Sequence, residues 1–233
     1  MSEDTIQLVV MRLMAIMQVS ILVPMAVVWY RQRHFSTPIK WLSWYVYLSA
    51  ASSLGATILY PAYLETNYGF SIGFNLGKIA LLAAVYHQVI PRSQVRQLLL
   101  ASSVAAIVGT LWLTSRDMNL AAAVGRVGQC AMLAAYALVY LSLTLNNPRA
   151  LPPTRDPMWL LSVGQLIYSA GTVTAFSLDY VTTTIANQPS KYILIAIAGL
   201  IFNYFLTLVF LRAGLPHPQL KATRQRPVRQ LAS

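Results

Sequence analysis

Seven long apolar runs, separated by short polar connectors, make up most of this chain of 233 residues. A helix needs about 20 mainly apolar residues to cross a bilayer, within a range of about 17–25. Each run is close to that length, so the pattern predicts an all-α membrane protein built as a seven-transmembrane-helix bundle. The predicted spans are Ile6–Tyr30, Trp41–Tyr63, Ser71–Ile90, Gln97–Thr114, Leu120–Leu145, Met158–Val181 and Tyr192–Leu211.

The two ends of the chain frame a single predicted domain. The start is acidic, with Glu3 and Asp4, and its apolar run is too long for a cleavable signal peptide, so we expect a true first span. We assign residues 1–215 to the transmembrane domain. Residues 216–233 form a basic, proline-containing tail that we predict to be disordered. The tail is too short to be a catalytic or DNA-binding module, so a signal would need a separate partner.

Composition supports a membrane protein over a soluble one. Charged residues make up 10% of the chain and hydrophobic residues 57%, whereas soluble domains carry about 25% charged residues. A single cysteine, Cys130, excludes an intramolecular disulfide, and the three histidines lack metal-ligand spacing. The sequence therefore indicates no metal site and no cofactor.

The net charge of +11 comes from cations placed mainly in the connectors. Twelve of the seventeen cations fall on one side of the predicted bundle, and only Arg116 and Lys191 fall in the opposite connectors. Because cytoplasmic loops carry the excess of Lys and Arg, this asymmetry places the N-terminus outside and the C-terminus in the cytoplasm. We expect a multi-pass protein of the cell membrane, the inner membrane in a bacterium, with lipid as its partner and no nucleic acid. The twelve are Arg31, Arg33, Lys40, Arg92, Arg96, Arg149, Arg155, Arg212, Lys221, Arg224, Arg226 and Arg229.

The three remaining cations, Arg12, Lys78 and Arg126, lie inside predicted spans. Ionisable residues at membrane depth are costly and are candidates for a functional site. At a rise of about 1.5 Å per residue, each lies about 9–11 Å below the outer surface. Asp179, near the outer end of the sixth span, reaches the same level. Four ionisable groups on four helices therefore share one predicted layer.

Polar residues accompany these charges at helical spacing. Asn75 approaches the face of Lys78, and Gln129 shares the face of Arg126. Gln165 and Tyr168 share the face of Asp179. We predict that the eight residues line an inward-facing, ligand-binding cavity.

A plainer interpretation is that each cation extends its head group to the interface along its aliphatic stem, or that Asp179 forms a structural ion pair with Arg126. One acid against three cations would still leave a surplus of two. Because unpaired buried charge is expensive, the layer needs water, an anion or a carboxylate-bearing ligand.

Enzymatic chemistry is not expected. There is no GxSxG motif, the histidine within the spans has no acid nearby, and six scattered acids cannot form a clustered site. Three functions stay open: a receptor or sensor that binds an anionic ligand and acts on a cytoplasmic or membrane protein partner, a small transporter or anion-conducting protein, and a structural subunit of a membrane complex. The continuous spans and the outward position of the charges favour the receptor, because transporters often have interrupted helices at mid-membrane.

Overall fold

The computed structural model describes the backbone of residues 3–63, 68–146, 155–181 and 188–213, and the side chains in these ranges except those of residues 3–4, 56–63, 178–181 and 188–189. Helices occur at all seven predicted positions, and no strand occurs in the described ranges. The all-α class is therefore confirmed for this part of the chain. The helices are α1 Glu3–Ser20, α2 Leu22–Arg31, η1 Gln32–His34 (a 3₁₀ turn), α3 Thr37–Tyr63, α4 Tyr68–Val89, α5 Ser93–Thr114, α6 Met118–Leu145, α7 Pro157–Val181 and α8 Gln188–Ala213.

Five helical segments of the described chain are long and apolar enough to cross a membrane. The helices α3 and α7 are as long but are not among the five, since α7 has a stripe of polar residues and α3 is rich in Ser, Tyr and Trp. The outer surface fits a lipid environment, because many large apolar side chains are exposed on it. Leu98, for example, is 70% exposed. The five segments are Thr5–His34, Tyr68–Val89, Ser93–Thr114, Met118–Leu145 and Ser190–Ala213.

The predicted first span is two helices that meet at Ile21. Pro24 has no N–H, so the carbonyl of Ser20 lacks its helical donor and the helix kinks. From α8, the Asn203 side chain donates hydrogen bonds to the carbonyl of Met17 at 3.3 Å and to Ser20 Oγ at 2.7 Å. These interhelical hydrogen bonds from α8 therefore stabilise the kink.

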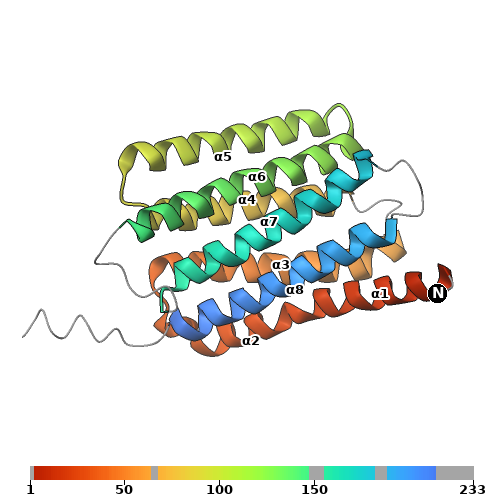
Figure 1. Cartoon of the computed structure of the whole chain (residues 1–233), viewed down its shortest axis with the longest axis horizontal. Coiled ribbons are helices and arrows are strands. Elements are labelled where there is room, and N and C mark those ends of the chain that lie inside the picture. The colour runs from red at the N-terminus through yellow and green to blue at the C-terminus, as the bar shows by residue number, and fades with distance from the viewer. Residues whose placement is uncertain (1–2, 64–67, 147–154, 182–187, 214–233) are drawn as a thin grey trace, which may run out of the picture.

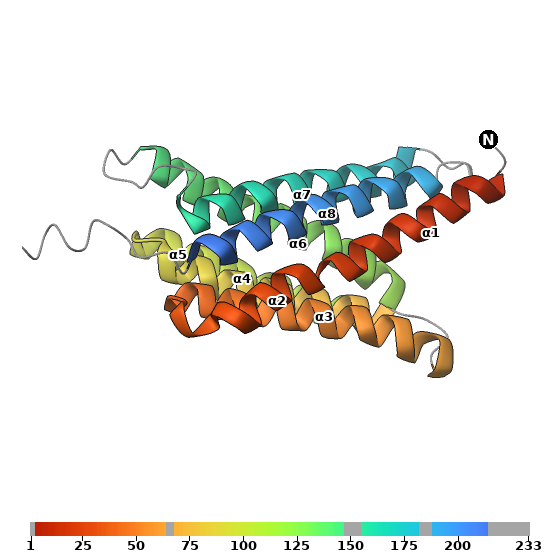
Figure 2. The ribbon, with the colours of Figure 1, turned by 90° about the horizontal axis from the view of Figure 1, so that it is seen from below.

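The helices lie roughly antiparallel in one bundle (Figure 1). The α1/α2 pair packs on α8, α8 on α7, α7 on α6, α6 on α4, and α4 on α3. Helix α5 is peripheral and packs mainly against α4 and α6. On the other side α2 packs against α3, whereas α1 diverges from α3 towards the N-terminus (Figure 2).

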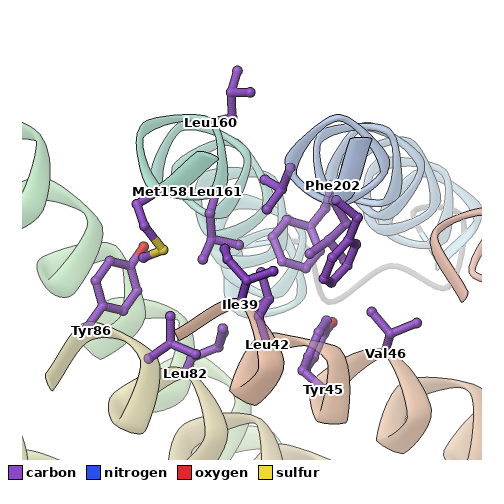
Figure 3. Close-up of a cluster of buried hydrophobic side chains, with 14 of the residues drawn as sticks. Ile39, Leu42, Tyr45, Val46, Leu82, Tyr86, Met158, Leu160, Leu161 and Phe202 are labelled. Atoms are coloured by element: carbon purple, nitrogen blue, oxygen red, sulfur yellow. The ribbon is translucent and has the colours of Figure 1, made fainter. Parts of the chain in front are cut away.

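The two ends of the bundle are packed differently. We call the end that contains η1 and the start of α5 the basic end, and the opposite end the N-terminal end. A large apolar cluster fills the half near the basic end, and Figure 3 shows part of it, with Leu82 and Tyr86 from α4 facing Leu161 from α7. Tyr86 and Ser162 share a hydrogen bond of 3.0 Å across α4 and α7. The separate cluster near the N-terminal end is small and consists of Ile72, Ala121 and Ala122 with a few half-buried neighbours.

Capping residues fix where two of the helices begin. The carboxylate of Asp117 accepts from the backbone N–H groups of Asn119 and Leu120, at 2.8 and 3.1 Å, and caps α6. Asp156 accepts from the N–H of Met158 at 2.9 Å and from the Tyr140 hydroxyl at 2.7 Å. Pro157 then occupies the first helical position, where its missing N–H costs nothing.

Candidate functional site

A cavity of about 240 Å³ lies towards the N-terminal end, bordered mainly by α1, α3, α4 and α8. Its walls are mixed. Met14 and Met17 of α1 and Phe70 and Phe74 of α4 supply apolar surface. Serines 49, 52 and 53 of α3 supply hydroxyl groups on one side. This volume is many times the space that one water molecule needs, so the cavity has room for several waters or for a small organic molecule.

Arg126 supplies positive charge to this cavity. The side chain comes from α6, is half-buried, and is one of the lining residues. Its Nη2 donates to Ser71 Oγ, and its guanidinium carbon lies 5.3 Å from the centre of the Phe176 ring. Both of these partners are neutral. Asn75, also in the lining, is buried and its Nδ2 has no hydrogen-bond partner in the described structure.

Lys78 lies deeper in the bundle, within a group of aromatic rings. Its side chain is 0% exposed, and Nζ has no hydrogen-bond partner among the described residues. Nζ lies 3.7 Å from the centre of the Tyr168 ring, 4.9 Å from that of Phe202 and 5.5 Å from that of Tyr45. These distances are those of cation–π contacts. We call these three residues the aromatic cage.

The aromatic cage is also the inner wall of the cavity. Tyr45, Tyr168 and Phe202 all line it, whereas Lys78 itself does not. The rings touch one another, with centroids 5.9 Å apart for Tyr45 and Phe202 and 5.3 Å apart for Tyr168 and Phe202. Figure 3 shows Phe202 on α8 above Tyr45 on α3, the two residues belonging to facing helices. One layer of rings therefore separates the buried ammonium from the cavity.

Further polar groups lie buried in the interior. Gln129 on α6 and Gln165 and Thr172 on α7 each have a side-chain oxygen without a partner in the described part of the chain. Gln165 donates from Nε2 to Ser169 Oγ at 2.9 Å. Buried polar groups are normally satisfied, so unmet donors and acceptors suggest that water or a ligand completes them.

The structure brings together half of the predicted site. Arg126, Asn75 and Tyr168 line the cavity, and Lys78 lies directly behind it. Gln129 and Gln165 are buried but do not line the cavity. The side chain of Asp179 lies outside the described residues, so its predicted place in the layer is not tested.

The prediction that Arg12 points into the shared cavity is wrong. Arg12 is exposed and is not among the residues that line the cavity. The α1 residues that line the cavity include Met14, Met17 and Gln18. At about 100° per residue, Arg12 projects from roughly the opposite side of the helix. Because a lipid-facing surface and a protein-facing surface are both apolar, the sequence of α1 did not show which way Arg12 points.

Two important residues were missed from the sequence, Tyr45 and Phe202. Both stand in apolar runs, where an aromatic residue usually packs in a core or at the interface. Their pattern carries no distinct signal, since the three cage residues come from three different helices. Met14 and Gln18, four residues apart on one face of α1, were a usable signal, because both residues line the cavity.

Comparison of the chain with protein-family models, with curated proteins and with solved structures gave no match. Among the described residues, no group of three or more His, Cys, Asp or Glu side chains is placed to hold a metal ion. The chemistry of the cavity is therefore inferred from its own residues: a guanidinium, an unpartnered amide, several hydroxyl groups and apolar walls.

Proposed function

We propose that this chain is a seven-span membrane receptor or sensor whose cavity binds a small anionic ligand, most simply a carboxylate, and that it signals through a separate cytoplasmic or membrane protein. The proposal places the N-terminus outside, on the basis of the distribution of Lys and Arg. The cavity then lies in the outer half of the membrane.

One observation carries the proposal: Arg126 lines the cavity and Lys78 lies behind its aromatic wall, and the partners of both among the described residues are neutral. A ligand carboxylate beside Arg126 would accept charge-assisted hydrogen bonds. The unpartnered Nδ2 of Asn75 offers it a further donor. Its apolar part would contact the side chains of Met14, Met17 and Phe74, which share the lining.

The packing of the bundle favours a receptor over a conducting pathway. The same helices that surround the cavity are packed by apolar side chains in the half near the basic end. A ligand would therefore act by shifting helices. The cage offers a route for that shift, because Tyr168 belongs to α7 and Phe202 to α8, and both contact the cavity.

The experiment is a thermal-shift screen of the detergent-solubilised protein with acetate, benzoate, phosphate and chloride. A ligand that binds only the folded state stabilises it by about 2.7 kcal/mol at a hundredfold excess over Kd. We expect at least one anion to raise the melting temperature of the wild type. Arg126→Gln should stay folded and lose this rise. Arg12→Gln removes one positive charge from an exposed site and should retain it.

Equal shifts in Arg126→Gln and Arg12→Gln would overturn the cavity as the binding site. If no anion stabilises the wild type more than Arg126→Gln, the structural-subunit function becomes the better explanation.

A transporter is the second candidate, favoured by the interruption between α1 and α2. The kink at Ile21 borders the cavity, as Ile21 is one of its lining residues, and interrupted helices beside a binding site are typical of transporters. Uptake of the stabilising anion into proteoliposomes separates the two. Saturable uptake that Arg126→Gln abolishes would replace the receptor with the transporter.

A further inference from the structure

A second concave surface lies on the outside of the bundle, between the start of α3, α4 and α5. Its volume is about 340 Å³. Small side chains of α4 (Ala80, Ala83 and Ala84) form its floor, and Leu100 and Ile107 of α5 form one wall. Because alanine leaves room that a larger side chain would fill, an apolar groove runs between α4 and α5. We call it the α4–α5 groove.

One end of the groove is polar. His87 and Gln88, which directly precede the last residue of α4, lie there. Trp41, near the start of α3, lines the same surface. The end of α4 and the start of α3 both lie at the basic end, so these three residues do as well. Tryptophan with a polar rim at the end of a span is typical of the membrane interface.

Arg96 of α5 is not a lining residue itself but lies one turn before Leu100, beyond the polar end of the groove. It precedes Leu100 by four residues and Ile107 by eleven, so all three lie on one face of α5. Arg96 is half-buried, and its Nε is a buried donor without a hydrogen-bond partner in the described residues. A guanidinium prefers a phosphate or carboxylate, which it can contact through two N–H groups. The exposed cations Lys40 and Arg92 lie at the same end.

We propose that the α4–α5 groove binds an anionic phospholipid from the leaflet at the basic end. Its phosphate accepts hydrogen bonds from Arg96, with His87 and Gln88 contacting the head group. One acyl chain lies along the alanine floor. From Leu100 to Ile107 the wall extends about 10 Å, which is about two thirds of one leaflet of a hydrocarbon core about 30 Å thick.

The peripheral position of α5 gives this lipid a structural role. Only Ser103 and Thr110 of its side chains are buried, and the helix packs mainly against α4 and α6. A bound acyl chain would extend the contact between α5 and α4. The inference depends on the chain lying in a membrane, but not on the anion cavity, because the cavity and the groove share no lining residue.

The test is binding of phosphatidylglycerol and phosphatidylcholine to the delipidated full-length protein, measured by native mass spectrometry and by thermal shift. We expect phosphatidylglycerol to bind tighter than phosphatidylcholine. Arg96→Gln should weaken phosphatidylglycerol about tenfold, the effect of losing one charged hydrogen bond. Arg33→Gln, which removes a charge from exposed η1, should leave it unchanged. Ala84→Phe, which fills the groove, should weaken both lipids.

Inorganic phosphate provides the third arm. It should not stabilise the protein at concentrations where phosphatidylglycerol does, because it has no acyl chain. Equal binding of the two lipids, equal losses in Arg96→Gln and Arg33→Gln, or unchanged binding in Ala84→Phe would each overturn the proposal.

Discussion

Lys78 is a costly residue to bury, because its side chain is 0% exposed. Removing an ammonium from water costs several kcal/mol, and its three donors meet no acceptor in the described residues. Contacts with aromatic rings offset part of this, at about 2 kcal/mol for a desolvated pair. The ring of Tyr168, at 3.7 Å, is the nearest of the three. The energy of the cage should therefore come mainly from the Lys78–Tyr168 pair.

A double-mutant cycle tests this pair. We expect Tyr168→Leu to destabilise the wild type more than it destabilises Lys78→Met, with a coupling of about 1–2 kcal/mol in the free energy of unfolding. Tyr168→Phe keeps the ring and should keep most of the coupling. The measurement is chemical unfolding in mixed micelles. A coupling of zero would show that the ammonium does not interact with the ring.

At this scale the sequence identified depth better than direction. Lys78 and Arg126 stood out because a charge within an apolar run is rare and costly, and both are at the site. Arg12 stood out for the same reason, but it is exposed. The direction in which a cationic side chain points depends on how its helix is rotated against its neighbours. A single sequence does not give that rotation.

The helices themselves were predictable because the bilayer sets their length. The predicted sixth span, Met158–Val181, differs from α7, Pro157–Val181, by one residue. The predicted first span, Ile6–Tyr30, lies within the apolar segment Thr5–His34, in which a turn at Ile21 separates α1 from α2. The beginning of α7 also follows from chemistry, because an Asp-Pro pair provides a cap and a favourable first residue.

Asp156 should be important for the stability of α7. Asp156→Ala removes the cap of Met158 N–H and the acceptor of the Tyr140 hydroxyl. We expect it to lower the free energy of unfolding by about 2–4 kcal/mol, from the lost cap and the unsatisfied hydroxyl. Asp156→Asn keeps an acceptor oxygen and should cost much less. Equal losses in the two variants would contradict this role.

Close approach of α7 and α8 depends on a glycine. A Cβ added at Gly171 would lie 2.7 Å from the Cβ of Ala198, so the helices pack through small residues. Gly171→Leu should force them apart and destabilise the fold by about 1–3 kcal/mol or more. Gly128→Leu is the control, because nothing lies within 4 Å of that position. Similar melting temperatures for the two variants would contradict the close packing.

For the whole molecule, the orientation follows from charge but has to be measured. Arg116 and Arg33 are both exposed and lie at opposite ends of the bundle. In intact cells, a cysteine at Arg116 should react with an impermeant maleimide, and a cysteine at Arg33 should react only after permeabilisation. Cys130 is buried and should give little background. The reverse pattern would invert the proposed orientation.

The arrangement of the helices was the least predictable feature of the molecule. Hydropathy gives the spans but not which spans are neighbours. Neither the peripheral position of α5 nor the divergence of α1 from α3 has a signature in the sequence of those helices. The cavity is bordered by both of the diverging helices, α1 and α3. Its lining comes from segments as distant along the chain as Met14 and Asn203, so it could not be located before the helices were placed.

The unequal packing of the two halves has a mechanical consequence. Close-packed interiors compress little, whereas internal voids are the part of a protein that yields to pressure. The half around the cavity is the softer one, and the half filled by the large apolar cluster is the stiffer. Lateral pressure from the bilayer should therefore narrow the gap between α1 and α3 first, while the helices at the basic end move together as a unit.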